Sequence, residues 1–396
     1  MIFQSIFVYF VLMLVMILFA SRASRLAPTY ENQDGLLVSK RSFWKLEIII
    51  PIIIFSLVSG MRYNVGADHL TYLDNYLNGR YSGKGEVLFN VFSDIGWYFN
   101  LHYTVFFGLI AFAQILFFFL AFRHERFLFP LLIFFLFTTG NYLFLMNVMR
   151  QALAMCVWLY ALKYIERKKL YSYALFCFLA FFIHRSSIIL IVFYPLLKGG
   201  RDYFKSVKLQ VLLLIGAFLV QQLFFNILMR FETVVTFYTS LLGDGLYDNY
   251  GLETLRESFV ESEGSGIATA VKILFNFVII LYSPQLKKYY NSKRFILIYF
   301  FFFLGLLTTY IFPSGAISLS RPFRYFYIFQ PIMYSYFLYF LYKNRVKSEH
   351  FFGFIAVLLL FSMIFILSQL SATENSYSLF QFYFQIPIHN GYPTAF

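Results

Sequence analysis

Five arginines of this sequence lie at or near the ends of apolar runs, where their side chains could bind a phosphate-bearing ligand. They are Arg62, Arg150, Arg185, Arg321 and Arg324. A guanidinium forms paired hydrogen bonds with phosphate oxygens and stays charged at any physiological pH. Arg150 stands out because it lies within the apolar stretch LFLMNVMRQALAMCVWLYAL, and ionisable groups at such depth usually have a function. Several arginines of this kind predict a polyanionic partner.

The arginines belong to four stretches that also carry other polar side chains. The stretches are GMRYNVGADHLTYLDNYLNG (60–79), FLMNVMRQALAM (144–155), FFIHRSSIIL (181–190) and PSGAISLSRPFRYFY (313–327). Glu86 follows the first of them. The further candidates for ligand contacts are Asp68, Tyr72, Glu86, Asn147, Gln151, His184 and Tyr325.

Each of these residues also has a structural interpretation. An arginine at a helix end can extend its charge to the membrane interface, and a tyrosine there belongs to the aromatic belt. His184 by itself could be a buried structural histidine. Arg62 and Asp68 could form only an exposed ion pair, which would contribute little to stability.

Common catalytic and cofactor motifs are missing from the sequence. There is no GxSxG, HExxH, P-loop or CxxC pattern. Cys156 and Cys177 both lie in apolar stretches, which argues against a disulfide framework or a metal site. We therefore expect no cofactor and no metal, and a chain without a nucleotide-binding loop is not a primary pump by itself.

The elements that must position these residues are membrane helices. Of the 396 residues, 60% are hydrophobic and only 13% are charged, and the mean hydropathy is +0.69. A helix of about 20 apolar residues spans a bilayer, and many runs approach that length. The runs are 2–20, 46–60, 101–121, 127–145, 151–164, 170–183, 187–197, 209–229, 268–284, 295–312, 325–342 and 351–369. The sequence thus predicts an all-α polytopic membrane protein, a single integral membrane domain over residues 1–396.

Most of the 32 Lys and Arg residues lie in alternate gaps between these runs. The basic gaps are 21–45, 122–126, 163–169, 198–208, 285–294 and 343–347. Because basic loops face the cytoplasm, this pattern predicts about twelve crossings with both termini outside. The acidic segment 230–267 becomes an external loop and 371–396 an external tail. The net charge of +13 is then an orientation signal, and we expect no nucleic-acid partner.

Two arrangements of residues 170–197 are compatible with their hydropathy, and the choice between them decides the topology of the rest of the chain. They could form one tilted helix, or two short segments broken at HRSS (184–187). Only the two short segments keep every later basic gap in the cytoplasm, so we prefer the break. Irregular backbone at that depth is tolerated only where it lines a cavity or is buried in protein. The four polar stretches then share the outer face.

The four motifs, in their order along the chain, resemble the EpsG family of Wzy-type exopolysaccharide and O-antigen polymerases. The resemblance covers roughly residues 45–345 and rests on GMRYNVGADHLTYLDNY, NVMRQALA, FFIHRSS and SRPFRYF. It implies a GT-C-like fold in the bacterial cytoplasmic membrane, with the active site facing outward. It also implies transfer of a growing glycan from undecaprenyl pyrophosphate to another lipid-linked repeat unit. The implied partners are that lipid-linked oligosaccharide and the bilayer, with a chain-length regulator and a flippase as candidates.

The resemblance also suggests roles for the residues. Arg150, Arg321 and Arg324 are the first candidates for binding the pyrophosphate leaving group, and Arg62 and Arg185 are weaker ones. The acceptor hydroxyl needs a base within hydrogen-bonding reach. The candidate bases, between which the sequence does not choose, are Asp68, His184 and Glu86.

Three other functions remain open. A lipid-linked oligosaccharide flippase would have charges through the full membrane depth and internal repeats, which we do not find. A membrane glycosyltransferase that adds one sugar from a prenyl-phosphate donor is kept open by Asp68 and Asp74 in the first external loop. A membrane acyltransferase with His184 as base is the third.

Overall fold

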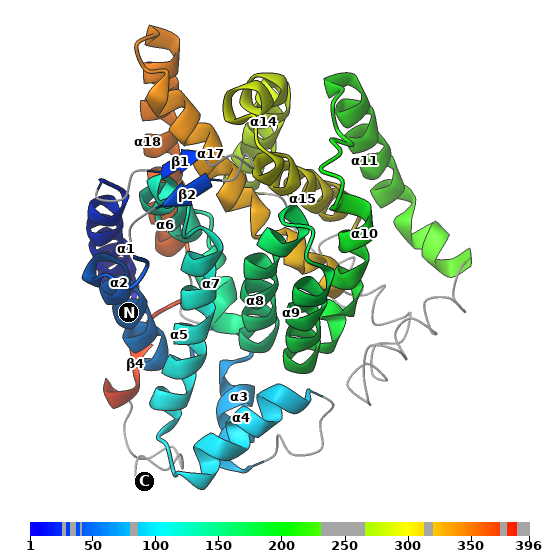
Figure 1. Cartoon of the computed structure of the whole chain (residues 1–396). Coiled ribbons are helices and arrows are strands. Elements are labelled where there is room, and N and C mark those ends of the chain that lie inside the picture. Colours follow the sequence, from blue (N-terminus) through cyan, green and yellow to red (C-terminus); the bar gives the residue numbers. More distant parts are fainter. Residues whose placement is uncertain are drawn as a thin grey trace.

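The computed structural model describes residues 1–25, 29–31, 37–39, 42–79, 86–230, 266–312, 320–372 and 378–385. Within these ranges the chain is a helical bundle, and each of the twelve apolar runs contains helix (Figure 1). The helices that begin and end close to the limits of a run are α1 (Ile2–Arg25), α2 (Leu46–Gly60), α5 (Tyr103–Ala121), α8 (Met149–Glu166), α9 (Leu170–Ile183), α11 (Val207–Arg230), α14 (Ile267–Tyr290), α15 (Lys293–Ile311) and α18 (Ser348–Leu370).

Five of the described helices are both long and apolar enough to cross a membrane, namely α1, α5, α14, α15 and α18. A sixth span is obtained if α6 (Phe129–Thr138) and α7 (Asn141–Asn147) are counted together. Other apolar helices, α2 and α9 among them, are shorter. The chain is therefore an α-helical, multi-pass membrane protein, while the number of about twelve crossings stays a prediction.

The run 127–145 is not one straight helix, as the sequence alone would suggest. It folds as η1 (Arg126–Leu128), α6 and α7, and the axes of the last two differ by 71°. Gly140 lies between them with a φ of +83°, a left-handed conformation that glycine adopts without strain. The run 325–342 is likewise divided, into η3 (Arg321–Phe326) and α17 (Phe329–Lys343).

The break at HRSS is confirmed. Helix α9 ends at Ile183, His184 is extended, and η2 (Arg185–Val192) with α10 (Phe193–Leu197) returns along α9. The hydroxyl of Tyr173 donates a hydrogen bond of 2.6 Å to the carbonyl of Leu190, which ties the outgoing segment to the returning one. Both segments pack beside α8, so the irregular backbone at 184–187 is covered by protein on one side.

Four of the basic gaps meet at one end of the bundle. The guanidinium of Arg294 is 3.2 Å from the carboxylate of Glu125 and 2.8 Å from that of Glu166. The ammonium of Lys287 is 3.0 Å from the carboxylate of Asp202. These contacts join the gaps 122–126, 163–169, 198–208 and 285–294, as the alternating pattern of charge predicts.

Aromatic side chains form much of the core between α8, α15 and α17. Trp158 of α8 is completely buried. Its ring centroid lies 4.9 Å from that of Phe301 on α15 and 5.7 Å from that of Phe329 on α17, both in edge-on arrangements. Its indole nitrogen donates to the hydroxyl of Tyr173 at 3.0 Å, so the polar atom of a buried tryptophan is satisfied. This core fixes α8 as the central helix on which the site is built.

Two short helices, α3 (His69–Leu77) and α4 (Val87–Tyr98), cover one end of the bundle, the lower one in Figure 1. Beside them β3 (Arg62–Tyr63) pairs antiparallel with β4 (Gln381–Phe382), and Tyr383 donates from its backbone to the carbonyl of Met61 at 3.0 Å. The short strand β1 (Thr29–Glu31) pairs with β2 (Leu37–Ser39), and η4 (Tyr383–Gln385) follows β4.

The two predicted external segments are only partly described. Of the acidic loop 230–267, residues 231–265 lie outside the described residues. Of the tail 371–396, residues 371–372 and 378–385 are described. This part of the tail packs on the start of α1, because Tyr9 donates to the carbonyl of Ser378 at 2.9 Å and the amide of Phe380 donates to the hydroxyl of Ser5 at 2.7 Å.

Candidate functional site

The first polar stretch is held against the start of α8 by a tight turn. Gly66 has a φ of +97°, and a Cβ at this position would lie 2.9 Å from the Cα of Asn147. Only glycine fits this close approach. The backbone amide of Asp68 then donates to the side-chain oxygen of Asn147 at 2.9 Å. Asp68 and Asn147, 79 positions apart, are thereby brought together close to Arg150.

Arg150 lies in the first turn of α8 and contacts residues of both covering helices. Its guanidinium forms an ion pair with Glu86, which directly precedes α4. It lies 3.4 Å from the hydroxyl of Tyr72 on α3. It also lies over two aromatic rings, 5.4 Å from the centroid of Tyr72 and 5.7 Å from that of Phe89. Phe89 was not among the candidates, because nothing in its sequence context separates it from the many other phenylalanines.

His184 completes this group from the third stretch. Its Nδ1 hydrogen-bonds the second carboxylate oxygen of Glu86, 98 positions away in the sequence. The backbone amide of His184 donates to Ala180 at 2.8 Å and its carbonyl accepts from Ser187 at 3.1 Å, so the break holds the ring in place. We call Glu86, Arg150, His184 and Tyr72 the Glu86 cluster.

The charge of Glu86 is set by its two partners. Burial by itself raises the pKa of this carboxyl, but the hydrogen bonds and charges of His184 and Arg150 together outweigh burial and hold the pKa below its ordinary value of 4.5. Glu86 is therefore ionised at neutral pH. A carboxylate facing Nδ1 favours the imidazole tautomer with its proton on Nδ1, which leaves Nε2 as the proton acceptor. Within the described part of the chain, Nε2 has no hydrogen-bond partner.

The fourth stretch joins the site through η3. The side-chain amide of Gln151 donates to the carbonyl of Arg321 at 2.6 Å. The hydroxyls of Tyr325 and Ser186 lie 3.1 Å apart, and Tyr325 is completely buried. All four polar stretches are thus brought to the start of α8. Arg185 follows His184 directly and is partly exposed.

Arg62 differs from the other arginines. Its side chain is 1% exposed, and its guanidinium donates to the carbonyls of Ser59 and Met146, the second at 2.7 Å. It also lies 5.5 Å from the ring centroid of Phe107. The interpretation of an exposed pair with Asp68 is wrong, since in the described residues Arg62 contacts carbonyls and a thioether instead of a carboxylate. These contacts tie the end of α2 to α7.

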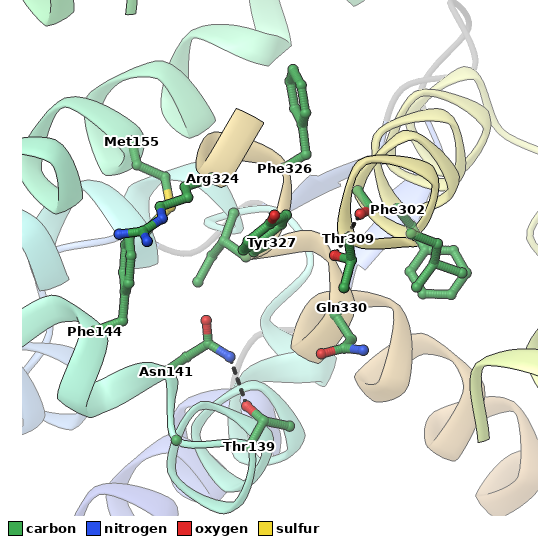
Figure 2. A pocket seen from close by; sticks show the side chains of 14 residues that line it. Thr139, Asn141, Phe144, Met155, Phe302, Thr309, Arg324, Phe326, Tyr327 and Gln330 are labelled. Carbon is green, nitrogen blue, oxygen red and sulfur yellow. Dashed lines mark hydrogen bonds between the residues drawn. The ribbon is translucent and has the colours of Figure 1, made fainter. Parts of the chain in front are cut away.

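A cavity of about 270 Å³ lies on another side of η3 (Figure 2). It is bordered by the α6–α7 break, α8, α15 and the start of α17, and Arg324 is part of its wall. Its polar side chains include Asn141 and Gln330, which were not among the candidates. For Asn141 the sequence does carry a signal, TTGN (138–141) inside an apolar run, because a glycine followed by an asparagine indicates a break there. Gln330 has no comparable signal.

Metal ligands do not gather in the described part of the chain, where no group of three or more His, Cys, Asp or Glu residues could hold an ion. The Glu86 cluster instead brings together an ionised carboxylate, an oriented imidazole and the guanidinium of Arg150 at one end of a helical bundle. Such a set can remove a proton from a hydroxyl and stabilise developing negative charge.

Fold and site together define a multi-pass membrane protein with a cluster of charged residues at one end of its bundle. The family model of EpsG matches residues 45–382, most of the chain, and the protein belongs to the EpsG family. Members of this family are Wzy-type polymerases, which assigns the chain to polysaccharide biosynthesis as a glycosyltransferase-like polymerase. Neither the curated proteins nor the solved structures give a match.

Proposed function

We propose that this protein polymerises lipid-linked oligosaccharides at the outer face of the bacterial cytoplasmic membrane. A growing glycan on undecaprenyl pyrophosphate is the donor, and the terminal sugar of another lipid-linked repeat unit is the acceptor. The acceptor hydroxyl oxygen bonds to the anomeric carbon of the donor, and the bond from that carbon to the pyrophosphate oxygen breaks. The electron pair leaves with the pyrophosphate, so the energy is contained in the donor.

The main support for the proposal is the contact of His184 with Glu86. The acceptor hydroxyl proton passes to Nε2 of His184, while the ionised Glu86 stabilises the imidazolium that forms. Glu86 itself is a weak base, because His184 and Arg150 lower the pKa of its carboxyl. Of the three candidate bases, His184 is therefore assigned the proton transfer and Glu86 its orientation. Asp68, next to Asn147, is assigned to the binding of the acceptor sugar.

The arginines act on the leaving group. Negative charge develops on the pyrophosphate as the bond breaks, and preplaced guanidiniums stabilise it most in the transition state. Arg150 remains partly accessible, with 23% of its side chain exposed. Arg321 and Arg324 come from η3, and Arg185 lies beside the base. Arg62 is assigned a packing role because of its burial.

The bundle supports the proposed orientation. Glu86 contacts Arg150 at one end of α8, and Arg294 contacts Glu166 at the other end. At 1.5 Å per residue these two positions are about 24 Å apart along the helix, comparable to the thickness of a bilayer core, about 30 Å. The end with the basic gaps faces the cytoplasm, and the Glu86 cluster faces outward. About twelve crossings and a GT-C-like architecture complete the proposed topology.

The experiment is a glycan size profile from the native host after deletion of the gene. The deletion strain is complemented with wild type, with Arg150→Ala, and with Arg345→Ala as a matched control. Arg345 is an exposed arginine near the start of α18. We expect single repeat units in the deletion strain and in Arg150→Ala, and a full ladder with wild type and Arg345→Ala, at equal protein abundance by immunoblot.

Two other results would overturn the proposal. Repeat units that accumulate on the cytoplasmic side without export would identify a flippase. A glycan of normal length that lacks one sugar would identify a transferase that adds a single sugar.

A further inference from the structure

The cavity beside η3 originates in the bend between α6 and α7. Helix α6 ends at Thr138, and the change of direction at Gly140 leaves room between α7, α15 and η3. The freed carbonyl of Thr139 accepts a hydrogen bond of 3.1 Å from the ammonium of Lys272 on α14. A partly buried cation from a neighbouring helix therefore stabilises the bend, and the space beside the bend is part of the fold.

Two amide side chains present oxygen atoms to this cavity (Figure 2). The nitrogen of Asn141 donates to the hydroxyl oxygen of Thr139 at 2.8 Å. The Thr139 hydroxyl gives its own proton to the carbonyl of Phe135, so the atom that faces it must be the amide nitrogen. The oxygen of Asn141 then points away from Thr139, into the cavity.

Gln330 is oriented in the same way. Its nitrogen faces the side-chain oxygen of Asn276 at 3.3 Å, and the hydroxyl of Tyr334 donates to that same oxygen at 2.7 Å. The oxygen of Gln330 is thus turned toward Asn141 and the cavity (Figure 2). In the described part of the chain, neither amide oxygen has a hydrogen-bond partner.

The chemistry of the walls restricts the ligand. Two hydrogen-bond acceptors require hydroxyl or amide protons from the ligand, so a phosphate does not fit on that side. On the other side the guanidinium of Arg324 lies beside Phe144 and Met155 (Figure 2), where it suits an anionic group. A hydrocarbon chain would leave the two oxygens without partners. The remaining walls are largely aromatic and aliphatic, as is usual for ligand pockets.

We propose that this cavity binds the sugar ring next to the pyrophosphate of the lipid-linked donor, with Asn141 and Gln330 as the residues that determine which sugar is accepted. The sugar hydroxyls donate to the two amide oxygens, and Arg324 binds the adjoining phosphate. The volume of about 270 Å³ is below the roughly 300–1,000 Å³ of pockets that bury a drug-sized ligand, so one ring enters and the rest of the repeat unit stays outside. This inference rests on the function proposed above.

The test compares two nearly isosteric variants, Asn141→Leu and Gln330→Met, in proteoliposomes. The substrate is the lipid-linked repeat unit extracted from the deletion strain, and sugar-free undecaprenyl pyrophosphate is added as a competing inhibitor. We expect the KM for the repeat unit to rise about tenfold in each variant, as for the loss of one discriminating hydrogen bond. The inhibition constant for sugar-free undecaprenyl pyrophosphate should stay unchanged.

Asn344→Leu is the matched control. It removes an amide that only bonds a carbonyl of its own helix near the basic end, and its KM should equal that of wild type. An unchanged KM in Asn141→Leu and Gln330→Met would overturn the assignment of the cavity. A parallel rise of KM and inhibition constant would do the same, because the cavity would then hold the pyrophosphate or the lipid chain. If wild type itself does not lengthen glycans in this assay, the proposed polymerase function fails instead.

Discussion

Replacing Glu86 by glutamine tests the central contact of the site with little change in shape. Glutamine keeps one oxygen that can accept the Nδ1 proton of His184, but it removes the negative charge. Its amide nitrogen also takes the place of an oxygen that now contacts Arg150. The substitution therefore weakens the stabilisation of the imidazolium and leaves the guanidinium without its carboxylate.

The size of the effect follows from these two contacts. A hydrogen bond to a charged group contributes about 1.5–3 kcal/mol. If this is lost for His184 in the transition state, the rate should fall roughly 10- to 150-fold, since about 1.4 kcal/mol corresponds to a factor of ten. The pair with Arg150 has side chains that are 23% and 11% exposed. Breaking this pair should therefore lower the free energy of unfolding by less than the cost of breaking a fully buried pair, which is about 3–5 kcal/mol.

The assay is polymerisation of extracted lipid-linked repeat units in proteoliposomes, with the rate divided by the amount of folded protein. Asp94→Asn is the matched control, because Asp94 is exposed on the same helix, α4. We expect its rate to equal that of wild type. A Glu86→Gln rate within about twofold of wild type, less than about 0.5 kcal/mol in the barrier, would refute the assignment of Glu86 and His184 as a catalytic pair.

Four further predictions concern individual residues. Wild type should be more stable than Glu86→Gln in thermal unfolding in detergent, with the full difference present above pH 4.5 and lost as the pH falls through the lowered pKa of Glu86. A stability difference that is already lost at neutral pH would contradict this prediction. Arg150→Lys should fold normally yet lose about tenfold in rate, because an ammonium lacks the planar fork of the guanidinium; a wild-type rate would argue against paired hydrogen bonds. Arg62→Met should lower abundance without changing the rate per molecule, since two carbonyls lose their donor at about 1–3 kcal/mol each; normal abundance with a lost ladder would restore its predicted role in binding. Arg294→Gln should lower the free energy of unfolding by about 3–5 kcal/mol, because it breaks a buried charge cluster, and should thereby lower abundance strongly. The exposed Lys288→Gln should leave abundance unchanged, and immunoblots of membranes compare the two variants.

Many elements of this protein follow from the order of its residues alone. Apolar runs of membrane length predict the helices, because a bilayer leaves no other partner for backbone polar groups. The alternation of basic gaps predicts the break that begins at His184, and α9 does end at the preceding residue, Ile183. Arg150 can be singled out for a related reason, since an ionisable group inside an apolar stretch costs free energy in the membrane and usually has a function.

The pairing of side chains could not be predicted in this way. Glu86 and His184 are 98 positions apart, and their approach depends on how α4 packs across α8 and α9. The same packing decides that Arg62, just after an apolar run, is buried while Arg150, within an apolar stretch, remains partly accessible. Residue type and spacing carry no information on either outcome.

The sequence by itself determined that this chain is a bundle of membrane helices, which polar stretches share one face, and to which family it is similar. Only the tertiary structure decided that His184 has Glu86 as its partner, and that Asn141 and Gln330 turn their oxygens into one cavity. The physical reason is the separation along the chain over which each kind of interaction acts. Hydropathy and charge act on each segment against the membrane, whereas a site depends on contacts between segments, which exist only after the helices have packed.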